Sequence, residues 1–131
     1  MRNRLPSWKT LAAVIAGLAL LGLGVLAAAN NYGKPKTVIH FITIKWKPEA
    51  TPEQRQAAVY GVEKMAAQIP GIKNVWLKTK RVQGAGFESV IAIEFENEEA
   101  IKVYEKHPAH DEWYKVYIPV RGQSLTHQAT N

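Results

Sequence analysis

The chain contains no cysteine, so disulfide bonds, thiolate metal sites and a cysteine nucleophile are all excluded. Without disulfide bonds, a small domain must be stabilised by packing or by association with another copy. The 131 residues, 47% of them hydrophobic and 21% charged, have the composition of one ordinary globular domain. No internal repeat is present, and no low-complexity stretch occurs outside the N-terminal segment.

A basic surface that could bind nucleic acid is also missing, although the formal net charge is +6. Arg2, Arg4 and Lys9 lie in an N-terminal segment that carries no acidic residue. When these three are set aside, 14 of the 17 basic residues remain against 11 acidic ones, and the signs of the charges alternate along the chain. We therefore exclude nucleic acid as a partner.

Residues 1–29 are predicted to be a targeting segment, either a signal peptide or an N-terminal membrane anchor. Residues 11–29 are uncharged and apolar, and they follow a basic stretch. A bilayer needs about 20 such residues, which favours an anchor that would attach the domain to the membrane. Three alanines at 27–29 favour cleavage, which we prefer. Both alternatives predict an exported, extracytoplasmic domain, which is periplasmic, secreted or membrane-anchored.

After a linker at residues 30–36, residues 37–131 are predicted to form one α+β domain of ferredoxin-like order, β-α-β-β-α-β. In the first strand, apolar alternation places His40 on the face that also carries Ile42. Thr51 and Gln54 predict a capping box at the start of the first helix. Its buried stripe is predicted to consist of Val59, Val62, Ala66 and Ile69. The strands are predicted at 37–47, 72–80, 87–96 and 121–130, and the helical segments at 51–68, 97–107 and 109–117.

Short motifs in this order resemble the stress-responsive A/B barrel, or Dabb, domain over about residues 36–131. The motifs are Val38-Ile39-His40-Phe41, Thr51-Pro52-Glu53-Gln54, Ile69-Pro70-Gly71-Ile72, and Tyr104 followed by His107-Pro108-Ala109-His110. The resemblance implies a four-stranded antiparallel sheet backed by helices, with two subunits packing their sheets into a dimeric α/β barrel. The partly apolar second faces of the first and third strands independently favour such a homodimer.

Plant polyketide cyclases similar to olivetolic acid cyclase share this resemblance, and they work without a metal or cofactor. By this resemblance His110 is the base, Tyr104 the hydroxyl donor and His40 an orienting or binding group. The chain departs from the cyclase pattern in two places. Ser89 stands where the cyclase has a further pocket histidine, and Val62 stands where it has a tyrosine.

The resulting hypothesis is a binding module whose pocket, between sheet and helices, holds a small apolar or aromatic molecule. His40, Ser89, Ile91 and Trp113 are its predicted ligand contacts. Two alternatives stay open, a cofactor-free cyclase or isomerase that uses His110 and Tyr104, and a structural dimer in which the same residues are core. We expect no metal site and no cofactor. His107 is expected to end a helix and to bond its last carbonyls.

Overall fold

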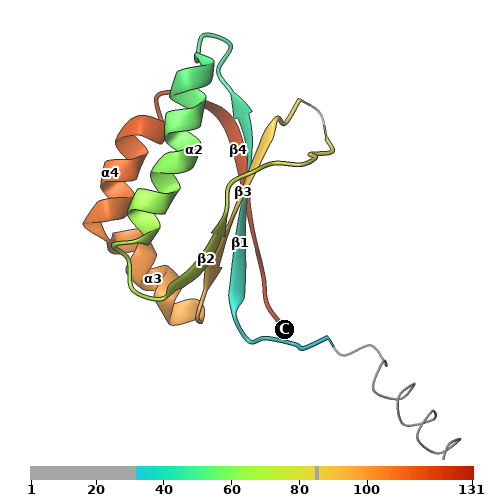
Figure 1. The fold of residues 1–131 in the computed structure, drawn as a ribbon, viewed down its shortest axis with the longest axis vertical. Helices are drawn as coiled ribbons and strands as arrows, with labels where there is room; N and C mark the ends of the chain where they lie inside the picture. The colour runs from blue at the N-terminus through green and yellow to red at the C-terminus, as the bar shows by residue number, and fades with distance from the viewer. Residues whose placement is uncertain (1–31, 85) are drawn as a thin grey trace, which may run out of the picture. The chain divides into compact units, whose positions relative to one another are not determined.

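The computed structural model describes residues 32–84 and 86–131, of which residues 35–131 form one compact unit (Figure 1). The predicted targeting segment at residues 1–29 lies outside the described residues. No helix in the described ranges is both long enough and apolar enough to cross a bilayer.

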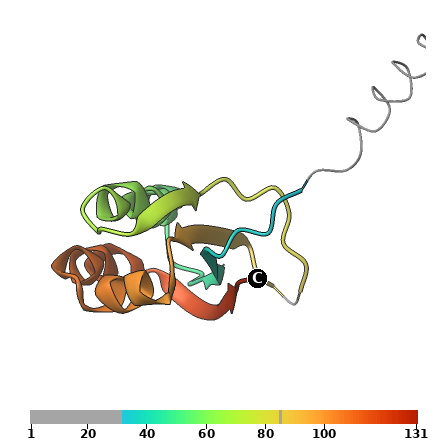
Figure 2. The ribbon, with the colours of Figure 1, turned by 90° about the horizontal axis from the view of Figure 1, so that it is seen from below.

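The predicted α+β fold is confirmed. The four strands form one antiparallel sheet in the order β2-β3-β1-β4. Figures 1 and 2 show the helices together on one face of this sheet, while no described element covers the other face. The elements are β1 (Val38–Trp46), α2 (Pro52–Ala66), β2 (Ile72–Trp76), β3 (Ser89–Phe95), α3 (Glu98–Lys106), α4 (Pro108–Tyr117) and β4 (Arg121–Ala129).

The core lies between the sheet and the helices, because β1 and β3 both alternate as predicted. On β1 the side chains at His40 and Ile42 are buried, whereas those between them are only partly covered. On β3 the inward side chains of Ile91, Ile93 and Phe95 have no exposed surface. Burial of these large apolar groups is the main stabilising contribution to the sheet–helix interface.

Helix α2 begins as predicted but faces the core with a different stripe. The Thr51 side chain accepts from the Gln54 amide and the Gln54 side chain accepts from the Thr51 amide, which completes the capping box. The predicted stripe of Val59, Val62, Ala66 and Ile69 is wrong at Val59 and Ala66, which are only partly buried. The helix is rotated by one residue, because its small residues face α4. The buried positions are Ala58, Val62, Met65 and Ile69.

Strand β2 is shorter than predicted and ends at Trp76. Beyond it, the Thr79 hydroxyl accepts from the Val90 amide at 2.9 Å and donates to the Val90 carbonyl at 3.2 Å. A side chain thus replaces the backbone ladder at this point, so the extended chain from 77 to 80 is no longer a strand.

Strand β4 contains a bulge that decides which residues face the helices. Ser124 pairs with Ile44, but the next inward pair is Arg121 with Trp46, so Gly122 is the extra residue. A Cβ at Gly122 would lie 2.9 Å from the Lys45 carbonyl oxygen, closer than side chains pack. Only glycine fits there without movement of β1, and the bulge turns Arg121 to the inward face.

Candidate functional site

A cavity of about 200 Å³ lies between the inner face of the sheet and the helices α3 and α4, where a pocket was predicted. Its walls come from β1, α3, α4 and β4, four elements that are distant in sequence. His40, Tyr104 and His110 all line it. The volume is below the roughly 300–1,000 Å³ of pockets for drug-sized ligands, so the cavity suits a smaller molecule.

The His110 ring is held between two tyrosine rings. Its centroid lies 4.2 Å from that of Tyr104 on α3 and 4.2 Å from that of Tyr114 on α4. On the other side of Tyr104, the His40 ring centroid lies at 5.8 Å. The three residues predicted to act together therefore share one cavity, and the packed rings restrict their orientations.

His107 places His110 but does so differently from the prediction. Its Nδ1 accepts from the Ala109 amide at 3.1 Å, so the ring caps the beginning of α4 rather than the end of α3. The reason is its extended backbone before Pro108, which turns the chain away from the α3 axis. The His110 amide then donates to the His107 carbonyl at 2.9 Å, which fixes the first turn of α4.

His110 carries a ring nitrogen that is buried in the cavity wall. Its Nε2 has no hydrogen-bond partner among the described residues. Burial lowers the pKa of His110, and the charges of Asp111 and Glu105, together with the backbone carbonyl of Glu105 near the ring, only partly oppose this shift. At neutral pH the imidazole is neutral and presents one donor and one acceptor, which is the state needed for a base or a hydrogen-bonding ligand contact.

His40 is also neutral, and its tautomer follows from its neighbour. Burial lowers the pKa of His40, with Glu105 opposing and His110 reinforcing the shift. The Gln128 amide nitrogen lies 3.3 Å from His40 Nδ1. With the amide nitrogen as donor, this contact favours the tautomer of neutral His40 in which Nδ1 accepts and Nε2 carries the proton. His40 is therefore oriented as a donor through Nε2.

Tyr104 is buried, with 3% of its surface exposed. Burial, and secondly Tyr114, raises the pKa of Tyr104 above its ordinary value, so its hydroxyl keeps its proton at neutral pH. Its ring also packs edge-on against Phe95, with centroids 5.1 Å apart. Tyr104 is thus both a core residue and a hydroxyl in the cavity wall.

Of the other predicted contacts, Trp113 lines the cavity, whereas Ser89 and Ile91 do not. Both lie on β3, which is on the β2 side of β1, while the cavity lies over β1 and β4. The Ser89 hydroxyl accepts from Trp46 Nε1 at 2.9 Å, and Ile91 is fully buried in the core. Their predicted role in ligand contact has no support from this geometry.

Several wall residues are not among the ligand contacts that the sequence predicted. Tyr117 lies seven residues after His110, on the same face of α4, which is a signal that helical spacing could have given. Arg121 had no such signal, because simple alternation from Ser124 places it on the outer face. These further wall residues are Ile42, Glu105, Tyr114, Tyr117, Arg121, Ser124 and Thr126.

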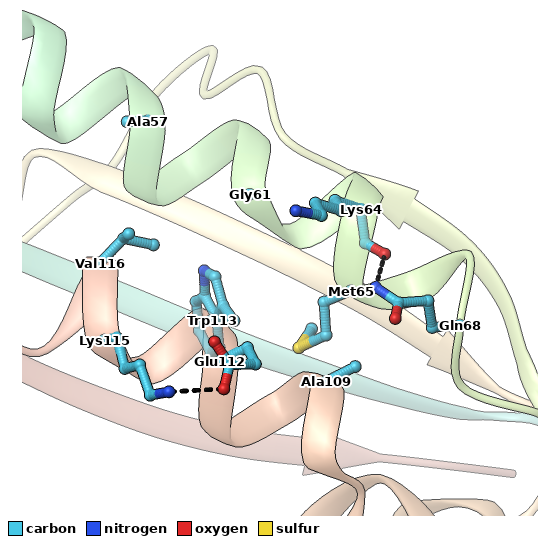
Figure 3. A pocket seen from close by; sticks show the side chains of 10 residues that line it. All are labelled: Ala57, Gly61, Lys64, Met65, Gln68, Ala109, Glu112, Trp113, Lys115 and Val116. Atoms are coloured by element: carbon cyan, nitrogen blue, oxygen red, sulfur yellow. Dashed lines mark hydrogen bonds and ion pairs between the residues drawn. The ribbon is translucent and has the colours of Figure 1, made fainter.

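A second hollow, of about 460 Å³, lies between α2 and α4 (Figure 3). Gly61 and Met65 on α2 and Val116 on α4 line its apolar part (Figure 3), and Trp113 lines both this hollow and the histidine cavity. Trp113 Nε1 donates to the Ala58 carbonyl at 2.8 Å, which ties the two helices together. No histidine and no unpaired buried polar atom lines this hollow.

Within residues 32–84 and 86–131, no three potential metal ligands are grouped together.

The single antiparallel sheet, the helices on one face and the histidine–tyrosine cavity beneath them define a ferredoxin-like α+β protein. Residues 38–127 match the model of the Stress responsive A/B Barrel Domain. The chain belongs to this Dabb family, which confirms the predicted resemblance.

Known relatives include two enzymes and a dimeric protein. The chain is 32% identical over 83 residues to olivetolic acid cyclase from Cannabis sativa, covering 61% of this chain and 82% of the cyclase. Hydroxynitrile lyase from Passiflora edulis has a TM-score of 0.66 at 15% identity, covering 72% of this chain and 93% of the lyase. A dimeric ferredoxin-like protein of unknown function from Thermobifida fusca has a TM-score of 0.61 at 20% identity, covering 78% and 97%. The two structural similarities establish the fold.

Proposed function

We propose that the domain binds a small apolar or aromatic molecule in the cavity between β1, β4, α3 and α4. The observation that carries this proposal is the buried Nε2 of His110, which no described protein group satisfies. Buried polar groups are normally paired, so a bound partner that hydrogen-bonds this nitrogen is the simplest way to satisfy it. Ile42 and Trp113 supply apolar wall around it.

The test is a fragment screen in which the NMR signals of the histidine rings report binding. A fragment in the cavity should shift the His110 and His40 ring signals but leave those of His127, which is exposed on the outer face of β4. Thr126→Leu adds bulk to the wall and should weaken binding, whereas His127→Gln on the same strand should not. Fragments that bind without moving the His110 signals would contradict this site.

The alternative is a cofactor-free cyclase or isomerase in which His110 removes a proton and Tyr104 polarises a carbonyl. It is favoured by the 4.2 Å separation of the two ring centroids and by burial, which keeps His110 neutral and Tyr104 protonated. It is also supported by similarity to olivetolic acid cyclase, although Ser89 and Val62 depart from the cyclase pattern.

A proton-abstracting site can be detected without its natural substrate. Benzylacetone (4-phenyl-2-butanone) in D₂O should exchange hydrogen next to its carbonyl faster with the protein than without it. His110→Ala should abolish the acceleration and leave the fold unchanged, while His127→Ala serves as the matched control. Binding without acceleration favours the binding module. If neither occurs and changes at His40 or Tyr104 only lower stability, the structural dimer is the remaining reading.

We propose further that the functional unit is an exported homodimer. The uncovered sheet face carries Ile39, Phe41, Val90 and Ala92 in an apolar patch next to Trp76, which is 51% exposed. Such a patch favours association with a second copy, and several solved relatives are described as dimeric.

The proposal of export rests on residues 1–29 alone. Cell fractionation with mass spectrometry of the N-terminus tests it, and an uncleaved cytoplasmic chain would refute it.

A further inference from the structure

One end of the cavity holds two buried donors that the proposed role of His110 does not use. The Tyr117 hydroxyl and Arg121 Nε are both buried, and neither makes a hydrogen bond of normal geometry among the described residues, although Ser124 and Arg121 lie near enough to the hydroxyl to lower the pKa of Tyr117 against the effect of burial. Tyr117 ends α4 and His110 begins it, so seven residues of helix, roughly 10 Å, separate their positions. Buried polar groups therefore line the cavity beside both the first and the last turn of α4.

The fold places these donors together by a specific device. The bulge at Gly122 turns Arg121 to the inward face of β4, where Ser124 and Thr126 also line the cavity. Arg121 Nη1 donates to the Ser124 hydroxyl at 3.0 Å, and its Cζ lies 5.6 Å from the Tyr117 ring centroid. These contacts hold the guanidinium in place while leaving Nε available. Bulges are frequent beside functional sites because they redirect a side chain in this way.

Arg121 brings a positively charged guanidinium to the cavity wall. No acidic side chain forms an ion pair with Arg121 in the described part of the chain. The one carboxylate in the cavity wall, Glu105, follows Tyr104 on α3 and acts electrostatically on His40 and His110. The cavity thus has a cationic end at Arg121 and an acidic rim near the histidines, which would orient an anion in one direction.

We propose that Arg121, Tyr117 and Ser124 form a carboxylate subsite, so the ligand is a small aromatic or apolar carboxylic acid. Its carboxylate accepts from Arg121 Nε and from the Tyr117 hydroxyl, and its body extends towards His110 and Tyr104. A planar carboxylate matches the planar edge of a guanidinium, and the 200 Å³ cavity leaves room for little more than one ring and a short chain. This inference rests on the proposed small-molecule function and specifies its ligand class.

The test compares two probes that differ only in charge, 3-phenylpropanoate and 3-phenylpropanamide. Binding to the full-length chain is measured by calorimetry and by tryptophan fluorescence, since Trp113 lines the cavity. The acid should bind about tenfold or more tightly than the amide, because charge-assisted hydrogen bonds are the stronger ones. Arg121→Gln should remove this preference, because the acid loses a charge-assisted hydrogen bond whereas the amide loses a weaker one. The same substitution at exposed Arg81 is the matched control.

Tyr117→Phe gives an independent test that does not depend on changing Arg121. Because the hydroxyl makes only loose contacts with Ser124 and Arg121 in the ligand-free chain, its removal should lower the melting temperature little. It should nevertheless weaken acid binding about fivefold, on the order expected for one hydrogen bond, and amide binding less, because the bond to a neutral carbonyl oxygen is the weaker one. A merely structural tyrosine would show the opposite pattern, with lower stability and unchanged probe preference.

The outcomes separate the subsite from the proposed function. Equal affinity for acid and amide in the unchanged chain, or an Arg121→Gln variant that still prefers the acid, would overturn the subsite while the cavity reading stands. If neither probe binds the unchanged chain, the small-molecule function fails and the subsite fails with it. If Arg121→Gln does not fold, Arg121→Lys takes its place, with partial loss of the acid preference expected.

Discussion

Tyr104 and His110 come from different helices, yet their ring centroids lie 4.2 Å apart. The cause is the short connection between them. The His107 amide donates to the Tyr104 carbonyl at 3.2 Å, and the His107 carbonyl accepts from the His110 amide at 2.9 Å. His107 is extended before Pro108, so α3 ends and α4 begins at one residue. The spacing of the motif therefore fixes the geometry of the site.

His107→Ala should destabilise the domain and disturb this geometry. Loss of an N-cap costs about 0.5–2 kcal/mol, because the Ala109 amide loses its acceptor. Urea unfolding measures the loss, and ligand-induced shifts of the His110 ring signals measure the displacement. His107→Asn, which restores a capping side chain, should recover most of the stability. A variant with alanine that unfolds like the unchanged chain would show that the cap contributes nothing.

Stability should fall when the pH is lowered through the ordinary histidine pKa of 6.5. Burial lowers the pKa of both His40 and His110, so the unfolded chain binds protons more readily than the folded one. Stability is therefore complete above 6.5 and is lost towards acidic pH. The measurement is denaturant unfolding at several pH values. His40→Gln with His110→Gln should flatten the profile, whereas His127→Gln should leave its slope unchanged.

Much of the fold was predictable from the sequence because its signals are local. Alternation in β1 placed His40 inward, and Thr51 with Gln54 marked the start of α2. The rest depended on tertiary contacts. Which stripe of α2 is buried follows from its packing against Trp113, and Ser89 is separated from the cavity by the strand order. No periodicity in one strand contains that information.

Phe41→Glu should convert the proposed dimer into monomers. Phe41 lies in the apolar patch on the uncovered face of the sheet, and a buried carboxylate there would have no partner. Analytical ultracentrifugation gives the mass in solution. Val103→Glu, at a helix position that is 45% exposed, introduces the same charge at another apolar surface residue and should not change the mass. If the Phe41→Glu variant still sediments as a dimer, the interface lies elsewhere on the domain.

Gly122→Ala should be among the more destabilising changes in β4, although it adds a single methyl group. The new Cβ would lie 2.9 Å from the Lys45 carbonyl oxygen and 3.2 Å from that of Trp46, both backbone atoms that cannot rotate away. We expect a loss of roughly 1–3 kcal/mol, typical of backbone strain at a special position. Gly33→Ala is the control, since a Cβ there meets nothing within 4 Å.

The same change connects stability to the cavity. If β1 and β4 separate to admit the methyl group, the bulge loses its register and Arg121 no longer pairs inward with Trp46. Urea unfolding and the acid-to-amide preference should then decline together in Gly122→Ala, whereas Gly33→Ala should change neither. A variant that loses stability but keeps the full acid preference would show that Arg121 reaches the cavity without the bulge.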